Sequence, residues 1–176
     1  MSQEAAHDGQ AEWHNRGADC PERAIIAGNR TGKTRSAAAE VALHLTGLYP
    51  DWWEGRRFDE PTSWIVAGPT NELTRDVCQF ALVGAMEPGT KVPDGTGWIP
   101  KEHIGNVDFR QCGVQNVIDT VKVKHSTGGW SELAFKSYEQ GNIKFQGVSR
   151  HGVWLDEEPT DHAIFTECQT RTLDKS

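Results

Sequence analysis

The sequence contains no long apolar run. None of its 176 residues falls in a stretch of about 18 consecutive apolar residues, the length that a membrane-spanning helix needs. Residues 1–16 are polar and lack the apolar core of a secretory signal. We therefore expect no membrane span and no secretory leader.

Cysteines and basic residues are also few. The four cysteines are scattered, with no Cys-x-x-Cys pair and no histidine at zinc spacing, so we expect reduced thiols in a cytosolic protein. Lys and Arg number 18 against 25 Asp and Glu, a net charge of −7, which argues against a free-standing DNA-binding domain of high affinity. This charge still allows a local basic strip.

The composition that remains is that of a globular domain. Hydrophobic residues make up 36% of the chain and charged residues 24%. The length is enough for one domain with a substantial core. We divide the chain into a polar N-terminal segment, residues 1–20, and one domain, residues 21–176.

Residues 27–34, AGNRTGKT, have the pattern of a phosphate-binding loop. They follow the apolar run 24–27, which predicts a strand, and precede the alanine-rich run 35–43, which predicts a helix ending near Gly47. Backbone N–H groups of such a loop surround a phosphate, and the helix N-terminus adds partial positive charge. The order strand, loop, helix therefore predicts nucleotide binding.

Two side chains of this loop have specific roles in the pattern. Lys33 would reach the β- and γ-phosphates, and Thr34 would ligate Mg²⁺. One position departs from the usual pattern, because Ala27 stands where the first glycine is expected and Gly28 would relieve the turn instead. The alternative is a strand–turn–helix joint with a chance Gly-Lys-Thr.

A matching half-site lies near the end of the sequence. The run 153–155 predicts a short strand, and Asp156, Glu157 and Glu158 follow it directly. Ligands of open parallel sheets lie beyond the carboxyl ends of the strands, so these carboxylates would lie beside the phosphate loop. Asp156 would hold Mg²⁺, and Glu157 would orient and deprotonate the attacking water. An acidic pair after a strand can also have a purely structural role. Its position in the sequence, after a phosphate loop, favours a nucleotide-binding site.

Between the two motifs, the pattern predicts a second strand–helix unit and a hairpin. We expect a strand over 63–67 and a helix over 72–83, capped by Thr70 or Asn71. Residues 84–113 predict a long loop with one helical turn after Pro100. The apolar side of the helix over 72–83 would consist of Leu73, Val77, Phe80 and Ala81. We expect hairpin strands over 117–124 and 131–137, on which Lys122, Lys124 and Lys136 would form either a basic ridge or a solvated face. A last helix is expected over 162–173.

With these motifs, the chain resembles the N-terminal ATPase domain of tailed-phage terminase large subunits. The resemblance covers most of the chain and rests on residues 23–34, 133–141 and 145–159. Many nucleotide hydrolases share the phosphate loop. The segment LAFKSYEQG and the Phe-Gln-Gly sequence leading into Asp-Glu-Glu are more particular to this family.

The resemblance implies a fold and a set of roles. The fold would be a three-layer α/β P-loop NTPase of the additional-strand, catalytic-glutamate class, with a mostly parallel central sheet and helices on both faces. ATP would be bound by the loop, with Lys33, Glu157 and Arg30 catalytic and Thr34 and Asp156 on Mg²⁺. Arg30 matches a proposed charge sensor of some family members; the alternative is a solvated side chain. The implied loop contacts are Ala27, Gly28, Asn29, Arg30, Thr31, Gly32, Lys33 and Thr34.

The same resemblance implies a motor that pumps double-stranded viral DNA into a procapsid in the cytoplasm of a bacterial host. Its implied partners are a portal protein, a small terminase subunit and further copies in a ring. The family's coupling strand and nuclease carboxylates are not found by residue 176, so we expect an incomplete ATPase domain with an uncovered sheet edge. The alternatives are a remnant that binds nucleotide or partners without turnover, and a helicase-like P-loop motor.

Overall fold

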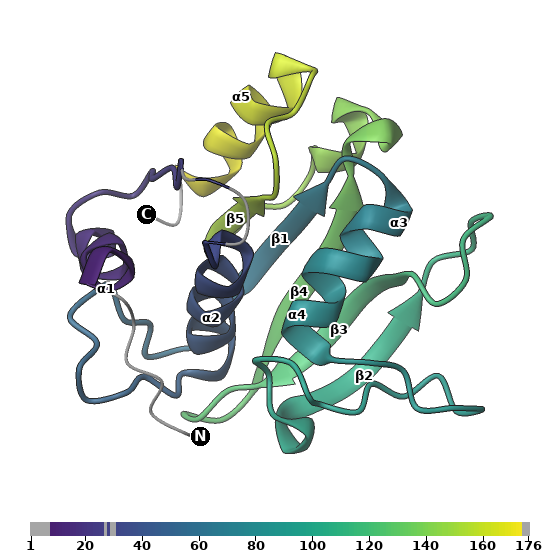
Figure 1. Cartoon of the computed structure of the whole chain (residues 1–176), viewed down its shortest axis with the longest axis horizontal. Helices are drawn as coiled ribbons and strands as arrows, with labels where there is room; N and C mark the ends of the chain where they lie inside the picture. Colours follow the sequence, from purple (N-terminus) through teal and green to yellow (C-terminus); the bar gives the residue numbers. More distant parts are fainter. Residues whose placement is uncertain (1–7, 27, 29–30, 174–176) are drawn as a thin grey trace.

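The structure, a computed structural model, describes residues 8–26, 28 and 31–173. A five-stranded sheet in the order β2-β3-β4-β1-β5 forms its centre (Figure 1). The strands are β1 (Ser63–Gly68), β2 (Ile104–Phe109), β3 (Ile118–Lys124), β4 (Trp130–Ser137) and β5 (Gly152–Leu155). The α-helices are α1 (Asp8–Asn15), α2 (Lys33–Thr46), α3 (Asn71–Leu73), α4 (Phe80–Val83) and α5 (His162–Thr172). The 3₁₀ helices are Arg16–Ala18, Lys101–His103, Tyr138–Gln140 and Asn142–Phe145, and Thr74–Gln79 is a π-helix.

The sheet is mixed, so the expectation of a mostly parallel sheet was wrong. β1 pairs in parallel with β4 and with β5, whereas β3 pairs antiparallel with both β2 and β4. The physical reason lies in the connections. The short turn through Gly128 and Gly129 leaves no room for a crossover, and such a turn can join only antiparallel strands.

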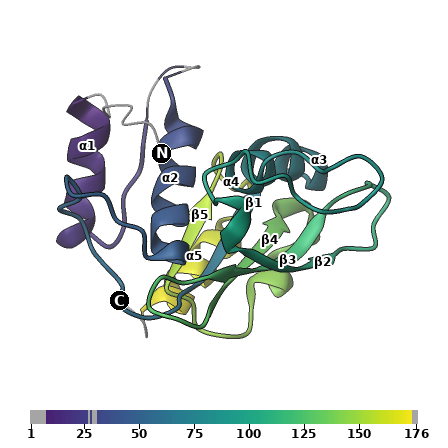
Figure 2. The same cartoon turned by 90° about the horizontal axis from the view of Figure 1, so that it is seen from below.

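Helices cover both faces of the sheet, as expected for an α/β fold (Figure 2). One face packs its larger apolar cluster against α2 and α4, through residues such as Val41, Leu82 and Phe135. The other face packs a smaller cluster against α5, through residues such as Ile65, Phe145 and Ile164. No helix in the described part of the chain is long and apolar enough to cross a bilayer.

Two predictions along the chain failed. The apolar run 24–27 forms no strand over residues 24–26, and Ile26 is 96% exposed because no strand partner covers it. Ala27 lies outside the described residues. Residues 104–109, predicted as loop, form β2. This strand was missed because its sequence, IGNVDF, alternates only partly between apolar and polar residues, and its pairing with β3 is irregular.

The helix predicted over 72–83 forms, but with a different buried face. Thr70 caps it by accepting a hydrogen bond from the Leu73 backbone N–H. Leu73 and Phe80, expected on the apolar side, are about half exposed. The π-helix inserts wider turns, which rotate the later residues away from the 3.6-residue period. Cys78 and Leu82 are buried, and of the predicted residues only Val77 and Ala81 pack partly buried against the core.

The other predicted elements are confirmed. The strand over 63–67, the hairpin, the strand over 153–155 and the helices over 35–43 and 162–173 all form with shifts of a few residues at their ends. Lys122, Lys124 and Lys136, for which a basic ridge and a solvated face were both left open, do not form an unopposed basic strip, because two of them lie near carboxylates. Lys122 pairs with Glu132 at 2.8 Å, and Lys136 lies 3.9 Å from Asp119.

A buried charged cluster joins the N-terminal helix to α2. Glu40 is 4% exposed, accepts from Arg23, and lies 2.8 Å from His14 Nδ1 and 3.6 Å from His44 Nε2. Burial alone would raise the pKa of Glu40, but hydrogen bonds from His14, His44 and Arg23 outweigh it and hold that pKa well below its usual range. Arg23 also donates to the Trp13 carbonyl at 2.8 Å. The segment that enters the phosphate loop is thereby anchored.

Gly47 ends α2 in a left-handed conformation, with φ of 69°. We expect Gly47→Ala to lower the free energy of unfolding by at least about 1–2 kcal/mol, the cost of a left-handed alanine. A Cβ there would also lie 2.5 Å from Ser126 Oγ. Urea unfolding measures the loss. Gly9→Ala is the control, because its Cβ meets nothing within 4 Å and a helical alanine should leave stability equal or higher; equal effects of both changes would contradict the prediction.

Candidate functional site

The N-terminus of α2 and the carboxyl end of β5 meet at one point. Thr34 Oγ1, in the first turn of α2, lies 3.4 Å from Asp156 Oδ1, directly after β5. These residues are 122 positions apart in the sequence. The two motifs found in the sequence therefore form one site, on the edge of the sheet where the parallel strands β1, β4 and β5 end (Figure 1).

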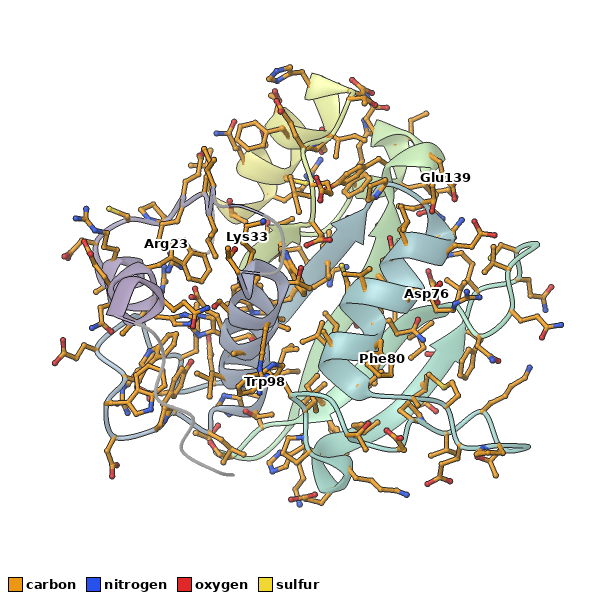
Figure 3. All side chains as sticks on the ribbon, in the orientation of Figure 1. Arg23, Lys33, Asp76, Phe80, Trp98 and Glu139 are labelled. Atoms are coloured by element: carbon orange, nitrogen blue, oxygen red, sulfur yellow. The ribbon has the colours of Figure 1, made fainter. Side chains whose placement is uncertain are left out.

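The described part of the loop is held by its own hydrogen bonds. Lys33 Nζ and Thr31 Oγ1 each donate to the Gly28 carbonyl, both at 2.8 Å. Gly32, just before α2, has a φ of 83°, which favours glycine at this turn. Figure 3 shows Lys33 at the end of α2 that faces the end of β5. Among the predicted loop contacts, Ala27, Asn29 and Arg30 lie outside the described residues.

The acidic half of the site has an unusual electrostatic setting. Burial, and then the charge of Glu157, raise the pKa of Asp156, while the Thr34 hydrogen bond and Lys33 oppose that rise. Asp156 is partly buried and Glu157 is exposed. Glu157 has a φ of 65°, a left-handed conformation that is uncommon for residues other than glycine.

A hydroxyl and a carboxylate facing each other suit a small, hard cation. Mg²⁺ prefers oxygen ligands, and proteins commonly supply one or two while phosphate oxygens and water complete the shell. Thr34 Oγ1 and Asp156 Oδ1 are oxygens of this kind, and their separation is short enough for both to contact one ion. The residues present therefore fit Mg²⁺.

Two contacts to this site were not predicted. Gln10, on α1, donates to the Thr31 carbonyl at 3.3 Å, so the N-terminal helix touches the loop. Tyr138 lies under the acidic turn, with its hydroxyl 2.8 Å from the Glu157 carbonyl. No local pattern marks Gln10. Tyr138 lies within a segment that carries the family resemblance, but only the fold places it beside Glu157. Trp13 packs beneath the Arg23 guanidinium, whose Cζ lies 4.6 Å from the centre of the Trp13 ring.

Comparison with known proteins decides the family. Residues 24–173 match the family model described as terminase large subunit, T4likevirus-type, N-terminal. The chain belongs to the terminase large-subunit family. Both halves of the candidate site lie within the match, from the phosphate loop to the acidic turn.

A curated terminase large subunit, that of Salmonella phage P22, is 39% identical over 186 residues. That alignment covers 96% of this chain and 36% of the phage protein, so the chain spans about a third of the length of this relative. No solved structure matches the chain. The terminase assignment therefore rests on sequence comparison.

Proposed function

We propose that this chain binds and hydrolyses ATP as a P-loop NTPase of the additional-strand, catalytic-glutamate class, within a phage terminase large subunit. The observation that carries the proposal is the 3.4 Å approach of Thr34 Oγ1 to Asp156 Oδ1 at the end of the sheet. It brings the Gly-Lys-Thr loop and the strand-end carboxylates together, as phosphoryl transfer to water requires.

Each residue then has a defined task. Lys33, which donates to the Gly28 carbonyl, would turn its ammonium group to the β- and γ-phosphates. Thr34 and Asp156 would hold Mg²⁺, which offsets negative charge on the phosphate oxygens when bound. Glu157 would accept a proton from the attacking water and orient it in line with the leaving oxygen. Arg30 would complement charge on the transferred phosphoryl group, and catalysis would be mainly positioning and electrostatics.

The biological role is a proposal of the same kind. The hydrolysis would power movement of double-stranded viral DNA into a procapsid, in the cytoplasm of a bacterial host. Portal protein, small terminase subunit and further copies in a ring would be the partners. The family membership of the chain and its similarity to the phage P22 large subunit support this role.

The decisive experiment is ATP hydrolysis by the purified chain with and without Mg²⁺. We expect Mg²⁺-dependent turnover, and we expect Lys33→Ala to weaken ATP binding by about tenfold to a hundredfold, because one charged hydrogen bond to phosphate contributes roughly 1.5–3 kcal/mol. Lys124→Ala, which removes an exposed lysine far from the loop, is the control. ATP affinity is measured with a fluorescent analogue.

Three outcomes distinguish the possibilities. Turnover that Lys33→Ala reduces and Lys124→Ala preserves supports the proposal. Tight binding without turnover, lost in Lys33→Ala, would reduce the function of this chain to nucleotide binding. Neither binding nor turnover would overturn the proposal for this chain.

A further inference from the structure

A buried tyrosine lies directly beneath the acidic turn. Tyr138 begins the short 3₁₀ helix that follows β4 and is 9% exposed. Its ring belongs to the apolar cluster between the sheet and α5, together with Ile164 and Cys168. Its hydroxyl lies 2.9 Å from the Asp156 carbonyl, 2.8 Å from the Glu157 carbonyl and 3.3 Å from the Ala67 carbonyl.

The direction of these hydrogen bonds is fixed by chemistry. Carbonyl oxygens can only accept, so the tyrosine hydroxyl is the donor and shares its one proton among them. Burial, and then the charge of Asp156, raise the pKa of Tyr138, so the hydroxyl keeps this proton over the whole physiological range.

The two nearest carbonyls lie on either side of one α-carbon. The Asp156 carbonyl belongs to the peptide plane before Glu157, and the Glu157 carbonyl belongs to the plane after it. Peptide planes are rigid, so hydrogen bonds to the carbonyls on both sides restrict φ and ψ of Glu157, and with them the direction of its Cα–Cβ bond. This is the residue with a φ of 65°, a conformation that persists only where the surroundings impose it.

The tyrosine is itself held in place. Ser137 and Gln140 form a capping box around its short helix, in which the Ser137 backbone N–H donates to Gln140 Oε1 at 3.2 Å. The next residue, Glu139, accepts from the Asn71 backbone N–H at 2.9 Å, which ties the short helix to the start of α3. The hydroxyl therefore extends from a rigid support to the acidic turn.

We propose that Tyr138 is a positioning residue that holds Glu157 in its left-handed conformation and so aims its carboxylate at the site. The catalytic consequence rests on the proposed function, in which Glu157 orients water. The hold on the backbone is a property of the fold and can be tested without turnover.

The test is Tyr138→Phe, which removes the hydroxyl and keeps the ring. The matched control is Tyr49→Phe, the chain's other tyrosine, whose hydroxyl lies 2.9 Å from His44 Nδ1 away from the site. We expect Tyr138→Phe to raise amide hydrogen exchange over residues 156–158, and to lower kcat by about tenfold to a hundredfold with ATP affinity unchanged. Tyr49→Phe should change neither.

A double variant separates positioning from general damage. If Tyr138 acts through Glu157, Tyr138→Phe should cause no further loss of residual turnover in a Glu157→Gln background. A further loss there, unchanged exchange over 156–158, or raised exchange with unchanged kcat would each overturn the proposal. If the wild-type chain does not turn over ATP, the proposed hydrolysis fails, and the exchange measurement alone decides whether Tyr138 holds the turn.

Discussion

Changing Glu157 to glutamine is expected to lower kcat for ATP hydrolysis by about 10²–10⁴-fold, the usual contribution of a positioned general base. Glutamine has nearly the same shape as glutamate but cannot accept the proton of the attacking water. ATP affinity should stay the same, because in the proposed site Lys33, Thr34 and Asp156, and not Glu157, would contact phosphate and metal. Single-turnover hydrolysis and nucleotide binding, measured side by side, separate the two effects.

The neighbouring residue supplies the control. Glu158 is exposed, belongs to the same acidic turn and has the same charge, so Glu158→Gln should leave kcat close to that of the wild type. If Glu158→Gln abolished turnover and Glu157→Gln did not, the water-orienting role would pass from Glu157 to Glu158. If both variants kept full activity, a carboxylate base at this turn would be excluded.

The two halves of the candidate site could be located in the sequence because each is a local pattern. A phosphate loop needs glycine, lysine and a hydroxyl within a few residues at the start of a helix, and that spacing is visible in residues 28–34. The strand before Asp156 is likewise a short apolar run. That the two halves meet was inferred from a rule about strand ends, and the contact between Thr34 and Asp156 confirms it.

Features set by long-range packing could not be predicted in the same way. The presence of β2, which adds a second antiparallel pairing to the sheet, depends on its contact with β3, and periodicity does not encode that contact. The π-helix turns Phe80 outward against its helical pattern. The run 24–26 is apolar enough for a strand but lies in no sheet. The contact of Tyr138 with Glu157 requires β4 and β5 to end at the same edge of the sheet.

The largest effect on stability should come from Glu40. We expect Glu40→Ala to lower the free energy of unfolding by about 3–5 kcal/mol, because it leaves Arg23 partly buried without its carboxylate. Urea unfolding at about neutral pH measures this loss. Glu12→Ala is the control: Glu12 pairs with Arg16 on the exposed side of α1, where such a pair contributes about 0–1 kcal/mol. Equal losses in the two variants would contradict a special role for the buried cluster.

The pH dependence of that loss identifies its cause. The folded-state pKa of Glu40 lies below its ordinary value of 4.5, so its charge stabilises the fold above about pH 4.5 and progressively less as the pH falls below it. The difference in unfolding free energy between wild type and Glu40→Ala should therefore shrink from pH 4.5 downward. Other carboxylates with lowered pKa values, such as Asp94 and Glu132, are present in both proteins and cancel in this difference. If the difference in unfolding free energy stays constant as the pH falls, Glu40 acts through the space it fills. If the difference shrinks, the charge of Glu40 holds Arg23, and with it the entry to the phosphate loop, in place.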